Sequence, residues 1–303
     1  MRAMEIVFYH GPTCADGLAS RWVAYKKWPD ATFIPFGTTE RMTPRQKAQC
    51  VDKNVLFVDV APTIDDVVWL HNNCSLTIYD HHYSTMQMLS YTGFISRIKT
   101  VICQHMCGCH ILWSQCFPHK PLPWALKYIE SRDLWRFSNK NERIISWIIS
   151  TNLISMFKSH KNINLLYNYL DKLCSSKGWL WKSSHSQKWS EYQQKISNII
   201  HDNVRQGLLT TPNNMMIHVY ILKTKFLWMA SDITEALNHL QNRGLFMFIR
   251  DDGGDGTSII TLRGMTALSV AQQWPNGGGH LMAAGFRTST TDINSRILFP
   301  SFI

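Results

Sequence analysis

The sequence contains no run of roughly 18 consecutive apolar residues, so we expect no membrane-spanning helix and no membrane partner. It also lacks a signal-peptide cleavage pattern after its first strand-like residues, which favours a cytoplasmic protein. In that compartment the eight cysteines are expected to be reduced thiols and not a disulfide framework. No internal repeat or low-complexity tract is visible, which argues against a repeat architecture.

Charged residues are scarce, at 17% of the chain against 45% apolar residues, which is the composition of a folded globular protein. The acidic residues number 21 and the basic residues 31, which gives a formal net charge of +10. Such a balance favours anionic partners such as nucleotides, oligonucleotides or polyphosphate, without requiring one. A chain of 303 residues is long enough for two domains.

Short apolar runs alternate with helical patterns in the first part of the chain. Residues 5–9, 55–58 and 76–79 are predicted strands, and residues 17–28 and 121–131 are predicted helices. Apolar strands separated by helices are typical of a parallel sheet that is covered on both faces. We therefore predict an α/β fold with a mostly parallel, doubly wound sheet.

The rest of the chain is first helical and then alternates again. Residues 141–204 have few turn signals, and the strand 215–222 and the helix 231–240 follow. The strands 245–250 and 257–263 are joined by DDGGDG, which predicts a hairpin turn.

These patterns divide the chain into three parts. We expect a catalytic core in residues 1–140, a helical linker in residues 141–210 and a smaller C-terminal α/β domain in residues 211–303.

Carboxylates, imidazoles and a thiol follow the predicted strands of the first part. They are His10, Cys14 and Asp16 after the first strand, Asp59 after the second, and Asp80, His81 and His82 after the third. Asp133 comes at the end of the predicted helix. Each alone would suggest a cap or turn residue, but the carboxyl ends of parallel strands share one edge. Such groups in one place repel each other or lose solvation energy unless a cation lies between them, so we predict a metal site.

The ligand types suit Mn²⁺, Fe²⁺, Zn²⁺ or Mg²⁺. Two such ions bridged by Asp59 would form a centre for phosphoryl hydrolysis.

Four segments in this order, HGPTCADG, FVDVAP, YDHH and SRDLW, resemble the metal motifs of the DHH phosphoesterase superfamily. The segment TLRGMTALSVAQQWPNGGGHLMAAGF resembles its DHHA1 partner domain. The resemblance spans nearly the whole chain, and it is nearest to the nanoRNase and oligoribonuclease branch, which is related to RecJ-type exonucleases. It implies an N-terminal DHH domain, a helical linker and a smaller C-terminal DHHA1 domain.

The resemblance also implies roles for single residues. One metal ion would be held by His10, Asp59 and Cys14, and the other by Asp16, Asp59, His81 and Asp133. The catalytic residues would be Asp59, His81, His82 and Asp80. Of these, His82 would face the substrate phosphate and Asp80 would orient a histidine, as a carboxylate behind a metal-binding imidazole does.

Cys14 departs from the family, which commonly has Asp at this position. A thiolate is a softer ligand and would shift the preference toward Zn²⁺, Fe²⁺ or Mn²⁺. Alternatively, Cys14 is not a ligand and the first site is weak. We expect two divalent ions, with Mn²⁺ favoured and Mg²⁺, Fe²⁺, Zn²⁺ and Co²⁺ as alternatives.

The glycine run Gly277, Gly278 and Gly279, with His280, is expected to bind substrate. Glycines allow close backbone approach and offer amides to an anion, and the following LMAAG is helix-competent, which together suggest a phosphate cradle. Arg263 would clamp a phosphate, with a surface arginine as the alternative. The resemblance places the substrate in the cleft between the two domains.

The segment CQHMCGCHILWSQCFPH is rich in cysteine and histidine but has no paired C-x-x-C spacing for zinc. We predict a core helix that places Cys103, Cys107 and His110 on one face with buried thiols, and a bound metal ion as the alternative.

The sequence thus favours a metal-dependent phosphodiesterase that cleaves short RNA or DNA oligonucleotides, or dinucleotides, to mononucleotides with a metal-activated hydroxide. A second hypothesis keeps the fold but changes the substrate to cyclic dinucleotides, bisphosphonucleotides, pyrophosphate or polyphosphate. A third is a nucleic-acid-binding homologue without catalysis, in which Cys14 is the first sign of decay. A homodimer is one of the assemblies to test.

Overall fold

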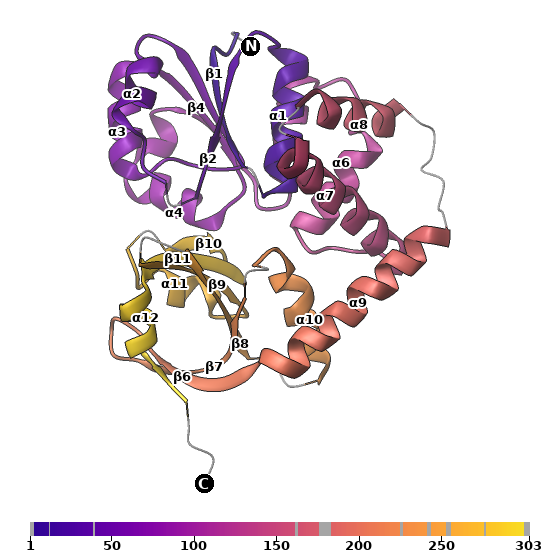
Figure 1. Cartoon of the computed structure of the whole chain (residues 1–303). Helices are drawn as coiled ribbons and strands as arrows, with labels where there is room; N and C mark the ends of the chain where they lie inside the picture. The colour runs from indigo at the N-terminus through magenta and orange to yellow at the C-terminus, as the bar shows by residue number, and fades with distance from the viewer. Residues whose placement is uncertain are drawn as a thin grey trace. The chain divides into compact units, whose positions relative to one another are not determined.

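The computed structural model describes residues 3–11, 13–38, 40–160, 163–175, 183–224, 227–240, 244–252, 256–275 and 277–299. The chain divides into two compact units, Met1–Ser186 and Gln187–Ile303. Each unit has its own β-sheet with helices packed on it (Figure 1), so the predicted α/β class is confirmed. Among the described helices, none combines the length and apolar character needed to cross a bilayer.

The first unit contains a five-stranded sheet in the order β2-β1-β3-β4-β5. Its strands are β1 (Ile6–His10), β2 (Thr32–Phe36), β3 (Asn54–Val58), β4 (Ser75–Asp80) and β5 (Lys99–Ile102). Every neighbouring pair is parallel, as predicted. The strand order reverses between β1 and β3, and in open α/β sheets the crevice at such a switch point is the usual place for a ligand.

Alternating apolar residues of the central strands face two separate cores. Val7, Tyr9 and Val58 pack on one side, and Phe8 and Phe57 pack on the other. The first core is covered by α1 (Ala15–Lys27), α5 (Gly108–Cys116), α6 (Trp124–Asp133), α7 (Lys140–His160) and α8 (Ile163–Ser175). The second is covered by α2 (Pro44–Cys50), α3 (Ile64–Asn73) and α4 (Tyr83–Tyr91). The sheet is therefore wound on both faces, as predicted.

Two strands of this sheet have weak sequence signals and were not predicted. Strand β2 contains Pro35, which lacks a backbone N–H and is tolerated because β2 lies at the edge. Strand β5 is the opposite edge, and its four residues are exposed or only partly buried.

The second unit contains a seven-stranded sheet in the order β10-β11-β9-β8-β7-β6-β12. The strands are β6 (Arg205–Thr210), β7 (Met216–Lys223), β8 (Leu245–Asp252), β9 (Thr257–Arg263), β10 (Gly278–His280), β11 (Ala283–Ser289) and β12 (Ile297–Leu298). The helices are α9 (Ser183–Asn203), α10 (Ala230–Leu240), α11 (Ala267–Ala271) and α12 (Thr290–Ser295). The pair β7–β8 is parallel, with α10 between its strands in the chain. Strands β8 and β9 pair antiparallel, as a hairpin requires, and residues 253–255 between them lie outside the described residues.

The glycine run was predicted to precede a helix, and that prediction is wrong. Residues 278–280 form β10, which pairs antiparallel with β11 from Ala283 onward. A Cβ on Gly279 would lie 2.6 Å from the Ala283 carbonyl oxygen, and one on Gly277 would lie 1.8 Å from that of Ala271. Glycine is therefore needed at these positions because the backbone of the same chain approaches closely. The small residues that follow fit a pair of strands as well as they fit a helix.

Gly17 offers a direct test of how α1 packs on the end of β1. A Cβ at this position would lie 1.6 Å from the His10 carbonyl oxygen, which belongs to a backbone that cannot move aside. Ala is normally better than Gly in a helix by about 1 kcal/mol, but here overpacking reverses the sign. We predict that Gly17→Ala lowers the free energy of unfolding by about 3 kcal/mol, as measured by denaturant titration.

Gly37→Ala is the matched control, because the nearest atom to its Cβ would be Glu40 Oε2 at 3.4 Å. We expect it to change stability by less than about 1 kcal/mol. Equal stabilities for the two variants would contradict the described contact between α1 and β1.

Candidate metal centre

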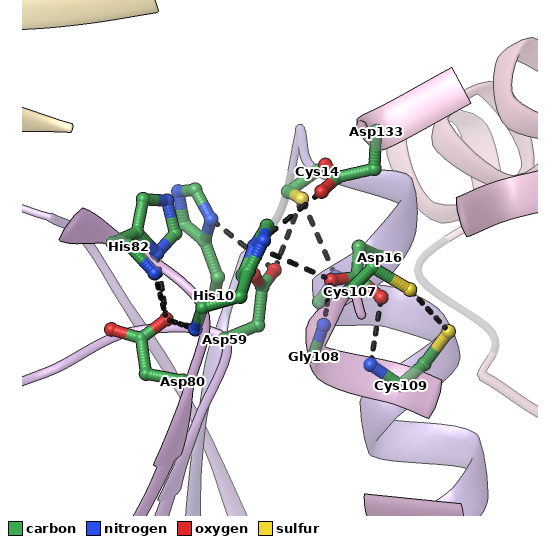
Figure 2. Close-up of polar contacts among 12 residues, drawn as sticks. His10, Cys14, Asp16, Asp59, Asp80, His82, Cys107, Gly108, Cys109 and Asp133 are labelled. Carbon is green, nitrogen blue, oxygen red and sulfur yellow. Dashed lines mark hydrogen bonds and ion pairs between the residues drawn. The ribbon is translucent and has the colours of Figure 1, made fainter. Parts of the chain in front are cut away.

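The ends of β1, β3 and β4 bring polar side chains to one edge of the first sheet (Figure 2). His10 is the last residue of β1, Asp59 follows β3, and Asp80 is the last residue of β4. The pairing of Tyr9 with Val58, and of Val58 with Tyr79, places these ends side by side. The convergence expected at the carboxyl ends of parallel strands is therefore present in the structure.

His81 lies at the centre of three carboxylates. Its Nε2 is 3.0 Å from Asp59 Oδ1, 3.4 Å from Asp133 Oδ2 and 3.8 Å from Asp16 Oδ2. The His81 side chain is only 1% exposed, as is that of Asp59. Asp133 reaches this point from the last residue of α6, and Asp16 from the first turn of α1.

Asp59 contacts both of the residue sets implied by the family resemblance. Its Oδ1 faces His81, while its Oδ2 accepts the thiol of Cys14 at 3.2 Å and lies 3.4 Å from His10 Nδ1. The backbone of Asp59 is left-handed, with φ of 59°, and its N–H donates to the Tyr79 carbonyl. Non-glycine residues in this conformation are uncommon and cluster at functional sites. The position between the two sets is the one that a bridging carboxylate would occupy.

Asp16 is fixed by two backbone amides at the start of α5. The N–H of Gly108 donates to Oδ2 at 2.6 Å and that of Cys109 to Oδ1 at 2.8 Å. A Cβ on Gly108 would lie 2.5 Å from the Cβ of Asp59, so glycine is needed for this approach.

Asp80 contacts His82 and the backbone of His81. Its Oδ1 accepts from the backbone N–H of His81 and lies 2.7 Å from His82 Nδ1, and its Oδ2 accepts from Thr85 Oγ1. The histidine whose ring Asp80 orients is thus His82, and the contact of Asp80 with His81 is to the backbone N–H.

Burial and crowding shift the pKa values of these groups in opposite directions. Burial, with the nearby charges of Asp59 and Asp133, raises the pKa of Asp16 well above its ordinary value. Burial alone would also raise the pKa of Asp59, but the imidazoles of His10 and His81 outweigh it and hold that pKa well below its usual range. Burial would lower the pKa of His81, but Asp133, Asp59 and Asp16 raise it well above the ordinary value. The three carboxylates of Asp16, Asp59 and Asp133 therefore share less positive charge than they would need to be ionised together.

The residues fit a pair of divalent cations. The ligand atoms of His10, Cys14 and Asp59 lie within 4.8 Å of one another, and so do those of Asp16, His81 and Asp133. Asp133 Oδ2 is buried and makes no hydrogen bond among the described residues, although it lies 3.4 Å from His81 Nε2. A buried oxygen without a hydrogen bond requires an explanation, and a bound cation would supply one. Nitrogen, oxygen and sulfur donors together suit Mn²⁺, Fe²⁺, Co²⁺ or Zn²⁺.

The residues expected to bind substrate lie in the second unit. Arg263 Nε donates to Ser231 Oγ and Nη1 to the Leu262 carbonyl, and burial lowers its pKa to about 10, so it stays charged at neutral pH. Arg263 pairs with Ala283, which pairs with His280, so Arg263 and His280 lie two strands apart, about 10 Å. Gly277, Gly278 and Gly279 lead into this same strand pair. Arg263 is half-buried and held by side-chain and backbone partners, and its contact with a phosphate stays a prediction.

The cysteine-rich segment departs from its predicted helix. Helix α5 begins at Gly108, so Cys103 lies before the helix and does not share a face with Cys107 and His110. The thiols of Cys107 and Cys109 are buried 3.4 Å apart, beside Asp16, and burial raises the pKa of both well above the ordinary value. Protonated, buried thiols agree with the core-packing interpretation.

Trp135, just after Asp133, is a strained residue that the sequence did not reveal. Its N–H donates to the Arg132 carbonyl and that of Arg136 to the Ser131 carbonyl, which closes α6 in a Schellman motif. Trp135 takes the left-handed position of this motif, with φ of 54°, where glycine is preferred. The guanidinium groups of Arg132 and Arg143 lie 5.0 and 5.6 Å from its ring centre.

Comparisons with known proteins do not assign the chain to a family. No family model matches the sequence. The chain is 23% identical over 304 residues to the uncharacterized protein R106 of Acanthamoeba polyphaga mimivirus, which covers 94% of this chain and 68% of that protein.

Two solved structures align with nearly the whole of this chain, but their TM-scores are low. A pGpG-specific phosphodiesterase from Vibrio cholerae has a TM-score of 0.42 and 10% identity, covering 96% of this chain and 95% of that one. An uncharacterized protein from Helicobacter pylori G27 has a TM-score of 0.37 and 13% identity, covering 97% of both chains. At these values the matches establish neither a family nor an activity for this chain.

Metal binding can be tested apart from catalysis. A cation that binds only the folded chain stabilises it, by about 2.7 kcal/mol at a free concentration of 100 times Kd. We predict that Mn²⁺ raises the free energy of unfolding by this amount and that Asp59→Asn abolishes the increment, as measured by denaturant titration with Mn²⁺ or with EDTA.

Asp66→Asn is the matched control. Asp66 is as buried as Asp59, but it binds the Met42 amide and Lys47 and lies outside the cluster. This variant should lose stability yet keep the Mn²⁺ increment. An increment that survives in Asp59→Asn would contradict the assignment of the centre.

Proposed function

We propose that the protein is a metal-dependent phosphodiesterase that hydrolyses short oligonucleotides or dinucleotides to mononucleotides. The observation that carries the proposal is the convergence of His10, Asp16, Asp59, His81 and Asp133 on one sheet edge. These residues come from four segments whose order resembles that of the DHH phosphoesterase motifs.

The chain's own residues would position and charge the centre. Two divalent ions, when bound, would supply a hydroxide nucleophile at neutral pH and offset the charge on the phosphoryl oxygens. Asp59 would hold the two ligand sets together, because its two oxygens already face one set each.

His82 is suited to contact the phosphate. Burial alone would lower its pKa, but the attraction and hydrogen bond of Asp80 outweigh burial and raise it. Asp80 holds the ring through Nδ1 at 2.7 Å, and a protonated imidazole held in this way would donate a charge-assisted hydrogen bond to a phosphoryl oxygen.

Nucleotides are favoured over simple pyrophosphate as substrates. The support is the DHHA1-like segment, which carries Arg263 and the glycine hairpin, because the pyrophosphatase branch of the family that the motifs resemble carries a different C-terminal domain. Arg263 uses Nε and Nη1 in its hydrogen bonds, and the donors on Nη2 would suit a phosphate oxygen. Cyclic dinucleotides, bisphosphonucleotides and polyphosphate are alternative substrates, and a nucleic-acid-binding protein without catalysis is the alternative of another class.

A turnover assay separates these possibilities. We predict that the full chain with Mn²⁺ releases mononucleotide from a labelled RNA dinucleotide, faster than it cleaves a cyclic dinucleotide, a bisphosphonucleotide or polyphosphate. Asp59→Asn should lower kcat by at least about a hundredfold, because it removes a charge at the reacting centre, while Asp66→Asn should stay active. The absence of turnover with Mn²⁺, Mg²⁺, Co²⁺ and Zn²⁺ on the whole panel would refute the proposal and favour the binding protein.

Cys14 can be assigned by spectroscopy. The thiol lies 3.2 Å from Asp59 Oδ2 and within 4.8 Å of the other ligand atoms of its set. We predict that Co²⁺ added to the chain gives a near-ultraviolet sulfur-to-cobalt charge-transfer band, because a thiolate ligand donates charge to the ion. Cys14→Asp, which restores the residue common in the family, should bind Co²⁺ without that band. A spectrum that is the same in both proteins would show that Cys14 is not a ligand.

A further inference from the structure

The segment CGCH, residues 107–110, lies beside Asp16, and the proposed metal centre gives it no role. Three successive amides of this segment donate to carboxylates. The N–H groups of Gly108 and Cys109 bind Asp16, and that of Cys107 binds Glu130 Oε2 at 3.1 Å. The first turn of α5 is therefore held between two acidic side chains that come from α1 and α6.

These contacts replace an ordinary helix cap. Cys107 is the N-cap residue of α5, and its side chain makes no capping hydrogen bond. A helix start normally has its free amides satisfied by a Ser, Thr, Asp or Asn at this position. Here the amides are satisfied from outside the helix, and the partial positive charge of the helix start favours both carboxylates.

The two amides leave Asp16 able to bind a cation. Each carboxylate oxygen has two lone-pair positions, and the amides use one on each oxygen. Asp16 Oδ2, which accepts from the Gly108 amide, also lies 3.8 Å from His81 Nε2. The two amides thus fix the orientation of the Asp16 carboxylate and leave each of its oxygens with a lone pair for a cation.

Glu130 is in turn fixed by His110. The Nδ1 of His110 lies 2.6 Å from Glu130 Oε2, and because an ionised carboxylate only accepts, Nδ1–H donates. Glu130 and Asp133 are three residues apart in α6, which places them on one face of the helix. One face of α6 therefore carries both the candidate ligand Asp133 and Glu130, which holds the turn whose amides bind the candidate ligand Asp16.

We infer that Glu130 and His110 form a positioning pair for Asp16: they fix the first turn of α5, and the amides of that turn fix the carboxylate. The inference rests on the proposed function, since it takes Asp16 to be a metal ligand. Residues that orient a ligand in this way typically affect metal affinity by 10- to 100-fold. Because the pair acts on Asp16 through the backbone of α5, its role is positioning and not catalysis.

The test measures Mn²⁺ affinity of the full chain by calorimetry, so that it does not depend on turnover. We predict that Glu130→Ala raises the Kd for Mn²⁺ about tenfold, because the Cys107 amide and His110 lose their acceptor. Glu130→Gln keeps an oxygen acceptor and should retain most of the affinity. His110→Ala should weaken binding, and His110→Asn, whose amide nitrogen replaces Nδ1, should restore it.

Glu142→Ala is the matched control. Glu142 accepts from Ser131 Oγ and the Ser138 amide, so it also secures the end of α6, but it does not contact α5. It should lose stability and keep the affinity for Mn²⁺. If Glu130→Ala does not fold, the His110 variants decide the question.

The outcomes separate the inference from the proposed function. Equal Mn²⁺ affinity in the wild type, Glu130→Ala and His110→Ala would overturn the inference alone, as would a loss in Glu142→Ala as large as that in Glu130→Ala. A wild-type chain that binds no divalent ion would overturn the inference and the proposed function together.

Discussion

The concentration of buried negative charge around His81 is the constraint on which the first unit depends. Asp16, Asp59 and Asp133 lie within 4 Å of one imidazole nitrogen, at the carboxyl ends of the strands of a parallel sheet. Removing a carboxylate from water costs several kcal/mol unless partners compensate. The sheet edge, the starts of α1 and α5 and the end of α6 all supply or support such partners.

Each carboxylate is compensated in a different way, and this explains the opposite directions of the pKa shifts. Asp59 lies beside two imidazoles, which hold its pKa low. At Asp16, burial and the charges of Asp59 and Asp133 outweigh His81 and the two neutral amides, so its pKa rises. Neutral dipoles stabilise a charge less than a cation does at the same distance. A divalent ion would remove this competition, which is why the cluster is better explained as a metal centre than as a set of internal ion pairs.

The sequence predicted the central strands β1, β3 and β4 and their ends because apolar runs with polar ends have a strong pattern. His10, Asp59 and Asp80 lie where that pattern places them. Other features carry no such pattern. The backbone amides of Gly108 and Cys109 have no side-chain signature, and the glycine hairpin depends on close contacts such as that of Gly279 with Ala283, which only the fold creates. Their roles could therefore be found only in the structure.

The turn after Asp133 places two opposing requirements on the residue at position 135. The left-handed backbone costs a non-glycine residue about 1–2 kcal/mol, and two cation–π contacts of about 0.5–1 kcal/mol each offset that cost. Glycine would relieve the backbone and lose the arginines, whereas another aromatic residue would keep the arginines and retain the strain. No single residue can therefore both avoid the backbone strain and keep the arginine contacts. The turn that follows Asp133 at the end of α6 depends on a residue that accepts the first cost to gain the second.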